Sequence, residues 1–175
     1  MDEESLITGC IKGNQKAQKL LFDGFSPKFF ALCLRYMKST DEAEDVLQEG
    51  MVKIFTKLPE FKGEGSFEGW MRRIVVNTCL DQIRKNQKLK FDVSIEEKEY
   101  KISMNAFIIE EMSANELIEE IKKMPPGYRV VFNMFAIEGY SHQEIAQKLG
   151  VSESTSKSQY LRARAYLKDR IVIDK

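Results

Sequence analysis

The polar and cationic residues between positions 141 and 167 have the spacing of two short helices that could read a DNA groove. Ser141 and Glu144 have the S-x-x-E spacing of a capping box, which predicts that a helix begins directly after Ser141. Gly150 predicts the end of this helix, because glycine readily takes the left-handed conformation that follows many helices. Ser152 then predicts the N-cap of a second helix. This order of elements is typical of a DNA-binding helix-turn-helix.

The second of these helices is expected to turn hydroxyl, amide and cationic groups outward, where they can bind base edges and phosphates. We expect Gln159 to contact a base edge and Lys157 to hold a phosphate. The inner side is expected to consist of Tyr160, Ala163 and Leu167, which recur at helical spacing. The alternative is an ordinary helical hairpin whose polar face is only solvated. The expected DNA-facing residues are Ser154, Thr155, Lys157, Ser158, Gln159 and Arg162.

Side chains that could carry out covalent chemistry are few and far apart. The chain has one histidine and three cysteines, Cys10, Cys33 and Cys79, each among apolar neighbours. This spacing matches no zinc site, so we expect three buried, reduced thiols. The sequence also contains no glycine-rich phosphate loop followed by Lys-Ser. It therefore predicts a protein that is not an enzyme and that uses no metal or other cofactor.

A helix expected after Ser39 carries a face rich in acidic side chains. Ser39 and Glu42 have capping-box spacing, and Pro59 predicts the end of the helix. At about 100° per residue, the apolar Val52 falls in the middle of the polar side. Such a face is typical of a protein-docking surface, although a solvated face with one stray valine gives the same pattern. The face consists of Asp41, Asp45, Gln48, Glu49 and Val52.

A helix expected from residue 67 to about residue 88 is a second candidate for nucleic-acid binding. Basic and amide side chains recur along one stripe of this helix, and Trp70 lies beside them. Cations hold phosphates, and an indole offers a stacking platform for a base. The preceding loop, residues 61–66, contains two glycines and could mould around such a base. The alternative for a lone tryptophan is burial in the core, and both interpretations of Trp70 can hold in part.

These elements predict an all-α fold of two small helical domains, an N-terminal helical bundle and a C-terminal helix-turn-helix, joined by an acidic linker. Hydrophobic residues make up 43% of the chain, which is enough for packed cores, and we expect no strand. The bundle is expected at residues 1–90, the linker at residues 91–115 and the helix-turn-helix domain at residues 116–175.

Capping residues and a proline predict the helices at the start of the bundle. A short helix is expected to end near Ile11, and Asn14 predicts the start of a second helix. Pro27 is expected to break or kink this second helix, because proline lacks an N–H and its ring clashes with the preceding turn. A separate, deeply buried helix is then expected at residues 29–37.

The charges cancel, with 27 Lys and Arg against 27 Asp and Glu, but they are segregated along the chain. Bases predominate between residues 122 and 170, and acids predominate between residues 92 and 120. Because local fields steer binding to phosphate, the last domain still suits DNA. The sequence has no apolar run of membrane-spanning length, and its acidic start is unlike a signal peptide. We therefore expect a cytoplasmic protein with no membrane insertion.

Three separated motifs together resemble the extracytoplasmic-function (ECF) group of bacterial sigma factors. They are DEAEDVLQEGMVKIF, FKGEGSFEGWMRRIVVNTCLDQIRK and MPPGYRVVFNMFAIEGYSHQEIAQKLGVSESTSKSQYLRARAYL, and the acidic linker separates the last two. The resemblance covers nearly the whole chain. It implies a subunit that binds core RNA polymerase, recognises promoter DNA and favours its melting. It also implies that the linker lies in the RNA path of the polymerase, unless the linker is a plain tether, and that an anti-sigma factor is a further candidate partner.

The same resemblance assigns a role to each face. It matches the acidic face to docking on the clamp helices of the large polymerase subunit, and the helix-turn-helix to the minus-thirty-five element. The pattern W-x-x-R-x-x-x-N-x-x-x-D-x-x-R is matched to binding of the minus-ten element. The residues expected there are Phe61, Lys62, Gly63, Ser66, Trp70, Arg73, Asn77, Asp81 and Arg84. Gln159 stands where relatives often have arginine, so the resemblance does not specify the promoter sequence.

Two other classes of protein fit parts of the sequence. A two-domain helix-turn-helix transcriptional regulator, acting without being a polymerase subunit, would bind its operator alone and as a dimer. A helical adaptor would bind only protein, through the acidic face. Co-purification with core RNA polymerase distinguishes these classes from a sigma factor.

Overall fold

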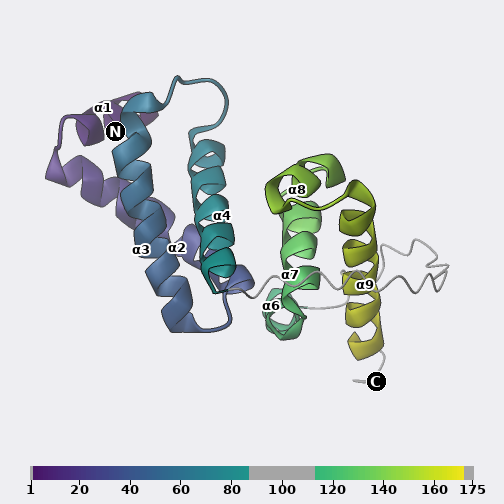
Figure 1. The fold of residues 1–175 in the computed structure, drawn as a ribbon. Coiled ribbons are helices and arrows are strands. Elements are labelled where there is room, and N and C mark those ends of the chain that lie inside the picture. Colours follow the sequence, from purple (N-terminus) through teal and green to yellow (C-terminus); the bar gives the residue numbers. More distant parts are fainter. Residues whose placement is uncertain (1, 87–112, 172–175) are drawn as a thin grey trace. The chain divides into compact units, whose positions relative to one another are not determined.

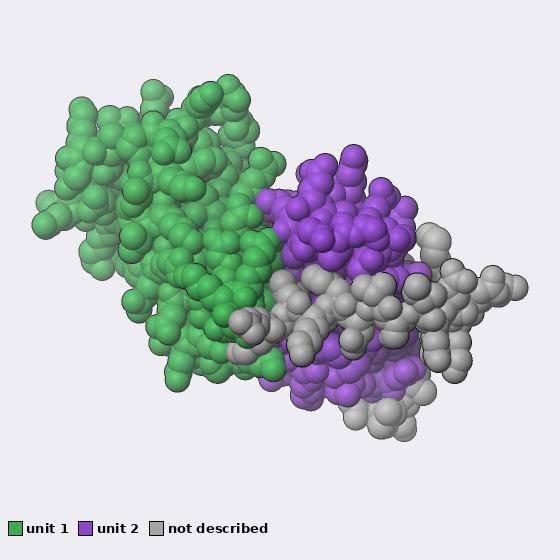
Figure 2. Space-filling model, viewed as in Figure 1, with its two compact units in different colours: residues 1–86 green, residues 87–175 purple. Residues whose placement is uncertain are grey.

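The computed structural model describes residues 2–86 and 113–171, and every regular element in these two stretches is a helix. The chain divides into two compact units, residues 1–86 and residues 87–175 (Figures 1 and 2). The predicted all-α fold with two small helical domains is therefore confirmed. Most of the predicted acidic linker lies outside the described residues. Its expected position in the RNA path of the polymerase therefore stays a prediction.

The first unit begins with two helices, α1 (Glu3–Ile11) and α2 (Gln15–Tyr36). The side chain of Asn14 closes the N-terminus of α2. Its Oδ1 accepts hydrogen bonds from the backbone N–H groups of Lys16 and Ala17, at 3.0 and 3.1 Å. The predicted N-cap is thus confirmed, because these N–H groups would otherwise lack a partner inside the helix.

Of the break or kink predicted at Pro27, the break is wrong, because α2 continues through this proline as one helix, while the kink stays a prediction. Pro27 leaves the carbonyl oxygen of Asp23 without its usual donor, but both residues are exposed, so water can bind that oxygen. Leu21 before the proline and Phe29 after it are both fully buried. Burial on both sides favours a continuous helix over the cost of about 3 kcal/mol that an interior proline imposes. The separate helix predicted at residues 29–37 is therefore the last part of α2.

Two further helices, α3 (Thr40–Lys57) and α4 (Phe67–Lys85), complete the bundle (Figure 1). Each of α2, α3 and α4 packs against the other two. Ser39 caps α3, and a 3-10 turn at Leu58–Glu60 ends it at the predicted proline. The bundle thereby buries one side of α3 and one side of α4, and it leaves their other sides to solvent.

The core of the bundle brings α3 and α4 into close contact at Gly50. A Cβ atom at this position would lie 3.4 Å from Cγ2 of Val75, so a longer side chain would push the helices apart. The Sγ atoms of Cys33 and Cys79 lie 3.9 Å from each other in the same core. All three cysteines, including Cys10, are buried and free, as predicted.

The second unit contains α6 (Ala114–Lys123), α7 (Pro126–Phe132), α8 (His142–Leu149) and α9 (Glu153–Ile171). A π-helical segment, η2 (Asn133–Ile137), follows α7 directly and has no counterpart in the sequence prediction. α9 packs against both α7 and α8. The buried core of this unit includes Ile121, Met124, Phe132, Ala163 and Leu167.

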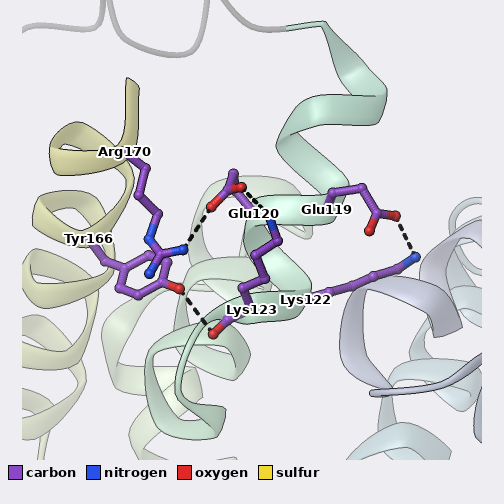
Figure 3. Close-up of polar contacts among 6 residues, drawn as sticks. All are labelled: Glu119, Glu120, Lys122, Lys123, Tyr166 and Arg170. Atoms are coloured by element: carbon purple, nitrogen blue, oxygen red, sulfur yellow. Dashed lines mark hydrogen bonds and ion pairs between the residues drawn. The ribbon is translucent and has the colours of Figure 1, made fainter. Parts of the chain in front are cut away.

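Side chains from α9 hold the C-terminal end of α6 (Figure 3). The hydroxyl of Tyr166 donates a hydrogen bond to the backbone carbonyl of Lys123 at 3.0 Å. Arg170 pairs with Glu120 at 3.2 Å, and its guanidinium lies 4.0 Å from the centre of the Tyr166 ring. Glu120 also accepts a hydrogen bond from Lys123, which is the main reason that the pKa of Glu120 lies below its usual value. These contacts satisfy a carbonyl that the end of a helix leaves open, and they fix α6 against α9.

Candidate nucleic-acid and protein interfaces

The acidic face of α3 consists of Asp41, Asp45, Gln48, Glu49 and Val52, and the structure turns it to solvent. Its first three residues are exposed and Glu49 is half-buried. Val52 is 64% exposed, although it is apolar. An exposed apolar side chain on a face that also carries acids can contribute buried area to a complex, while the acids select a partner of suitable charge.

Lys53 links the acidic face to α4. Its Nζ lies 2.8 Å from Oε1 of Glu49 and 3.6 Å from Oδ2 of Asp81. Asp81 in turn pairs with Arg84, one helical turn further along α4, at 3.1 Å. The hydrogen bond from Lys53 is the main reason that the pKa of Glu49 lies below its usual value. We assigned no role to Lys53 from the sequence, because only the packing of α3 on α4 brings it to Asp81.

The five predicted residues on α4 form one stripe along the helix. Trp70, Arg73, Asn77, Asp81 and Arg84 are separated by three or four positions, which turns their side chains to the same side. Each of them is exposed or half-buried. The structure therefore brings two guanidinium groups, an amide and an indole together on one surface, and these are groups that can bind phosphates and an unstacked base.

Trp70 is half-buried because two phenylalanines hold its ring. The centre of its ring lies 5.2 Å from that of Phe61 and 6.0 Å from that of Phe67. The Phe61 and Phe67 rings are themselves 5.2 Å apart. Trp70 thus supports the loop before α4 with part of its indole and keeps the rest accessible. Partial burial of Trp70 is thus observed, and its role as a stacking platform for a base stays a prediction.

The loop between η1 and α4 is shaped by two glycines. Gly63 and Gly65 have φ angles of 72° and 84°, which a residue with a side chain adopts only with strain. Lys62, Gly63 and Ser66 are exposed, whereas Phe61 turns its ring onto Trp70. Phe61 therefore supports the loop, and the other three predicted loop residues are accessible to a ligand.

The predicted helix-turn-helix forms as α8 and α9. Ser141 and Glu144 make a complete capping box at the start of α8. Gly150 ends that helix with a left-handed φ of 68°. Oγ of Ser152 accepts a hydrogen bond from the backbone N–H of Thr155 at 3.0 Å, which caps α9. These local predictions are confirmed.

The predicted outward position of Gln159 is wrong, because this residue is only 2% exposed. From there its amide cannot reach a base edge. Ser156 is also fully buried, and both residues continue the buried stripe of Ala163 and Leu167. Tyr160, which we expected inside, is only half-buried. The prediction failed because it took the apolar residues alone to define the inner side, whereas two polar residues define it as well.

The side of α9 that contains Gln159 faces the core, so Leu161 lies on the outer side of the helix, where it is 42% exposed. Leu161 shares this side with Ser154 and Lys157, which are exposed as predicted. Lys157 pairs with Glu153 one turn earlier, at 2.8 Å. Leu161 was not among the predicted outward residues, which were all polar or cationic. The half-buried predicted residues of α9 are Thr155, Ser158 and Arg162.

His142 connects three elements of the second unit. Its ring stacks on Phe135 of η2 with a centroid distance of 4.1 Å, and its Nδ1 lies 2.9 Å from Oγ of Ser156 in α9. Partial burial is the main cause that lowers the pKa of His142, and the positive charge of Lys157 adds to it while Glu153 opposes it. The fold therefore favours the neutral ring, which positions α8 against α9.

Two sigma-factor family models match the chain. The model for sigma-70 region 2 matches residues 21–89, and the model for sigma-70 region 4 matches residues 114–167. The chain is similar to the RNA polymerase sigma-H factor of Pseudomonas aeruginosa, with 26% identity over 174 residues that cover 93% of this chain and 90% of the relative. It is also similar to the ECF RNA polymerase sigma-E factor of Haemophilus influenzae, with 26% identity over 182 residues that cover 98% and 96% of the two chains.

Two solved structures have a similar fold. One is CnrH in complex with the cytosolic domain of CnrY, with a TM-score of 0.53 and 23% identity over 97% of each chain. The other is the sigma factor RpoE in complex with the anti-sigma factor NepR from Bartonella quintana. Its TM-score is 0.56 with 21% identity, over 90% of this chain and 97% of the solved one.

Neither a metal cluster nor a membrane helix is found within the described residues. In residues 2–86 and 113–171, no three or more His, Cys, Asp or Glu side chains gather in a way that could hold a metal ion. None of the helices formed by these residues has the length and apolar character needed to cross a membrane.

The lowered pKa of His142 predicts that the second unit loses stability in mild acid. His142 binds a proton more easily in the unfolded chain than in the folded one. The contribution of the neutral His142 ring to the stability of the fold is therefore complete above the unfolded pKa of about 6.5. This contribution is lost as the pH falls through the folded pKa, which is lower. Because the chain has one histidine, its imidazole proton NMR signal should titrate with a midpoint below about 6.5.

The matching stability measurement is urea unfolding followed by circular dichroism between pH 7.5 and 5.5. His142→Phe keeps a ring on Phe135 but cannot be protonated, so it should reduce the dependence of the unfolding midpoint on pH. An NMR midpoint above that of a histidine in an unfolded peptide would contradict the assigned environment.

Proposed function

The chain belongs to the sigma-70 family, in its ECF group, and we propose a separate role for each of its exposed faces. One face binds the polymerase, a second binds the melted strand and a third recognises the upstream promoter element. As a sigma factor it binds core RNA polymerase and directs promoter recognition and melting, which initiates transcription. Sigma factors are initiation factors rather than enzymes, and we propose no covalent chemistry for this chain. The observation that carries the assignment of faces is that the predicted site residues of α3 and α4 are all exposed or half-buried.

The acidic face of α3 is our proposed docking surface for the polymerase clamp. Val52 supplies an exposed apolar contact, and Asp41, Asp45 and Glu49 supply negative charge along the same helix. The apolar contact adds affinity when water leaves it, and the charges speed the encounter and exclude partners of the wrong sign. None of these side chains is needed to fill the core, so the face can be changed without unfolding the bundle.

The stripe on α4 and the loop before it are our proposed site for the melted minus-ten strand. Trp70 offers part of its indole for stacking, and Arg73 and Asn77 lie beside it with exposed polar ends. A base can enter such a site only after it leaves the duplex stack, at a cost of a few kcal/mol. Stacking returns about 1–3 kcal/mol per base, so the site shifts the equilibrium toward melted DNA instead of forcing the strands apart.

The outer side of α9 is our proposed reader of the minus-thirty-five element. Ser154 and Lys157 supply polar and cationic contacts, and Leu161 replaces the buried Gln159 as a candidate for base contact. An apolar side chain in the major groove distinguishes thymine through its methyl group. We therefore propose that Leu161 favours thymine at one position, while Lys157 leaves Glu153 to hold a phosphate.

Core RNA polymerase and promoter DNA are the partners that sigma-factor function requires. Because bacterial RNA polymerase works in the cytoplasm, we also place this protein in the cytoplasm. An anti-sigma factor stays a prediction for this chain, because the solved complex with NepR concerns RpoE. The domain boundaries at residues 90 and 116 and the role of the acidic linker also stay predictions.

The docking proposal predicts that a triple variant, Asp45→Lys, Glu49→Lys and Val52→Asp, binds core polymerase more weakly by about tenfold or more. It reverses two charges and removes the apolar contact from an otherwise exposed surface. The measurement is competition against the labelled wild-type chain for purified core. A matched control on α2, Leu20→Asp with Asp23→Lys, changes an exposed apolar residue and an exposed acid elsewhere and should compete normally. Full competition by the folded triple variant would refute the docking assignment.

The strand-capture proposal predicts that Asn77→Ala and Arg73→Ala lower the yield of open complex on duplex promoters, measured by permanganate reactivity of thymines. A pre-melted promoter should restore much of the lost open-complex yield, because binding by the variant then no longer has to compensate for the free energy of opening the duplex. Gln82→Ala removes an amide from a different side of α4 and is the matched control. Wild-type permanganate reactivity in both folded variants would show that the stripe is only a solvated surface.

The upstream proposal predicts different defects for Leu161→Ala and Lys157→Ala in promoter binding by the holoenzyme. Leu161→Ala should lose the preference for thymine at one position, and replacing that thymine by uracil should weaken the wild type but not the variant. Lys157→Ala should weaken all sequences alike and lower the salt slope by about 1. Equal sensitivity of wild type and Leu161→Ala to uracil at every position would exclude a methyl contact.

A further inference from the structure

The side chain of Lys53 is shared by two surfaces that have separate proposed roles. On one side it binds Glu49, which belongs to the acidic face, with a distance of 2.8 Å. On the other side it lies 3.6 Å from Asp81, which belongs to the stripe on α4. The shorter contact is to Glu49. Lys53 is itself half-buried between the two helices, so its ammonium group cannot swing away into solvent as easily as that of a fully exposed lysine.

The chain of charges continues from Asp81 to Arg84. The Asp81 carboxylate receives Arg84 at 3.1 Å on Oδ1 and faces Lys53 at 3.6 Å with its other oxygen. A cation and an anion thus alternate from Glu49 through Lys53 and Asp81 to Arg84. In such a row, strengthening one pair weakens the next, because a charge neutralised by one neighbour attracts the other less.

We propose that Lys53 is a positioning residue that couples polymerase docking on α3 to strand binding on α4, an inference that rests on the proposed roles of these two faces. When a donor group of the polymerase binds Glu49, Lys53 moves toward Asp81. Asp81 then holds Arg84 less tightly, and the guanidinium of Arg84 turns to a phosphate of the melted strand. The free chain keeps Arg84 on Asp81 and therefore binds single-stranded DNA more weakly than the docked chain does.

The coupling acts equally in both directions, because a binding free energy shared by two sites is reciprocal. Strand binding at Arg84 therefore also strengthens docking at Glu49. Each link is an ion pair accessible to water, so the expected effect is up to about fivefold in affinity. It should shrink at high salt, which screens such pairs.

The test removes the negative charge of Glu49 by substitution, which imitates its neutralisation by docking. DNA binding is then measured with the full chain in the absence of polymerase. Glu49→Gln should raise the affinity for a fluorescent oligothymidylate, followed by anisotropy at low salt, by up to about fivefold. Asp45→Asn makes the same change in net charge on α3 without touching Lys53, and it is the matched control. In the Lys53→Gln background, Glu49→Gln should raise the affinity no more than Asp45→Asn does.

Asp81→Asn is the positive control, because it removes the ion pair between Asp81 and Arg84 directly and should raise DNA affinity with or without Lys53. Circular dichroism verifies that each substitution leaves the bundle folded. A gain for Glu49→Gln equal to that of Asp45→Asn would overturn the coupling, and so would a gain that persists unchanged without Lys53. These outcomes are separate from a failure of the docking proposal, which the competition for core polymerase detects without DNA.

Discussion

The close packing of α3 on α4 at Gly50 is the contact on which the surfaces of the first unit depend. A Cβ at this position would already touch Val75, so a larger residue would separate the two helices. Their separation sets the distance between the acidic face and the stripe on α4. Lys53, one turn after Gly50, reaches within 3.6 Å of Asp81 on α4. We infer that a larger residue at position 50 would alter the spacing of the two exposed surfaces.

Helix ends were predictable from the sequence because the signals that set them are local. Asn14, Ser141 and Gly150 each act on groups within a few residues, so their roles could be assigned before any packing was known. Pro27 misled us for the opposite reason. Its local effect is to break a helix, but burial of apolar residues on both sides of it depends on α3 and α4, and this burial outweighs the local effect.

The candidate faces were predictable to the extent that apolar periodicity identifies the inner side. On α3 that rule placed Val52 outside, as the structure does. On α9 it failed, because Ser156 and Gln159 are polar and yet buried, and Leu161 is apolar and yet exposed. Ser156 is buried where His142 meets it, a contact between two helices that no count along one helix contains. Lys53 was missed for the same reason.

Ion pairs within the chain have a physical consequence at its proposed DNA-binding faces. Lys157 and Arg84 each carry an acidic partner, Glu153 at 2.8 Å and Asp81 at 3.1 Å. A phosphate must compete with these carboxylates, which reduces the gain from releasing counterions that drives most non-specific DNA binding. We infer that such self-pairing works against DNA binding by the free chain. Polymerase docking then adds the missing free energy, so recognition occurs mainly in the complex, where melting can follow it.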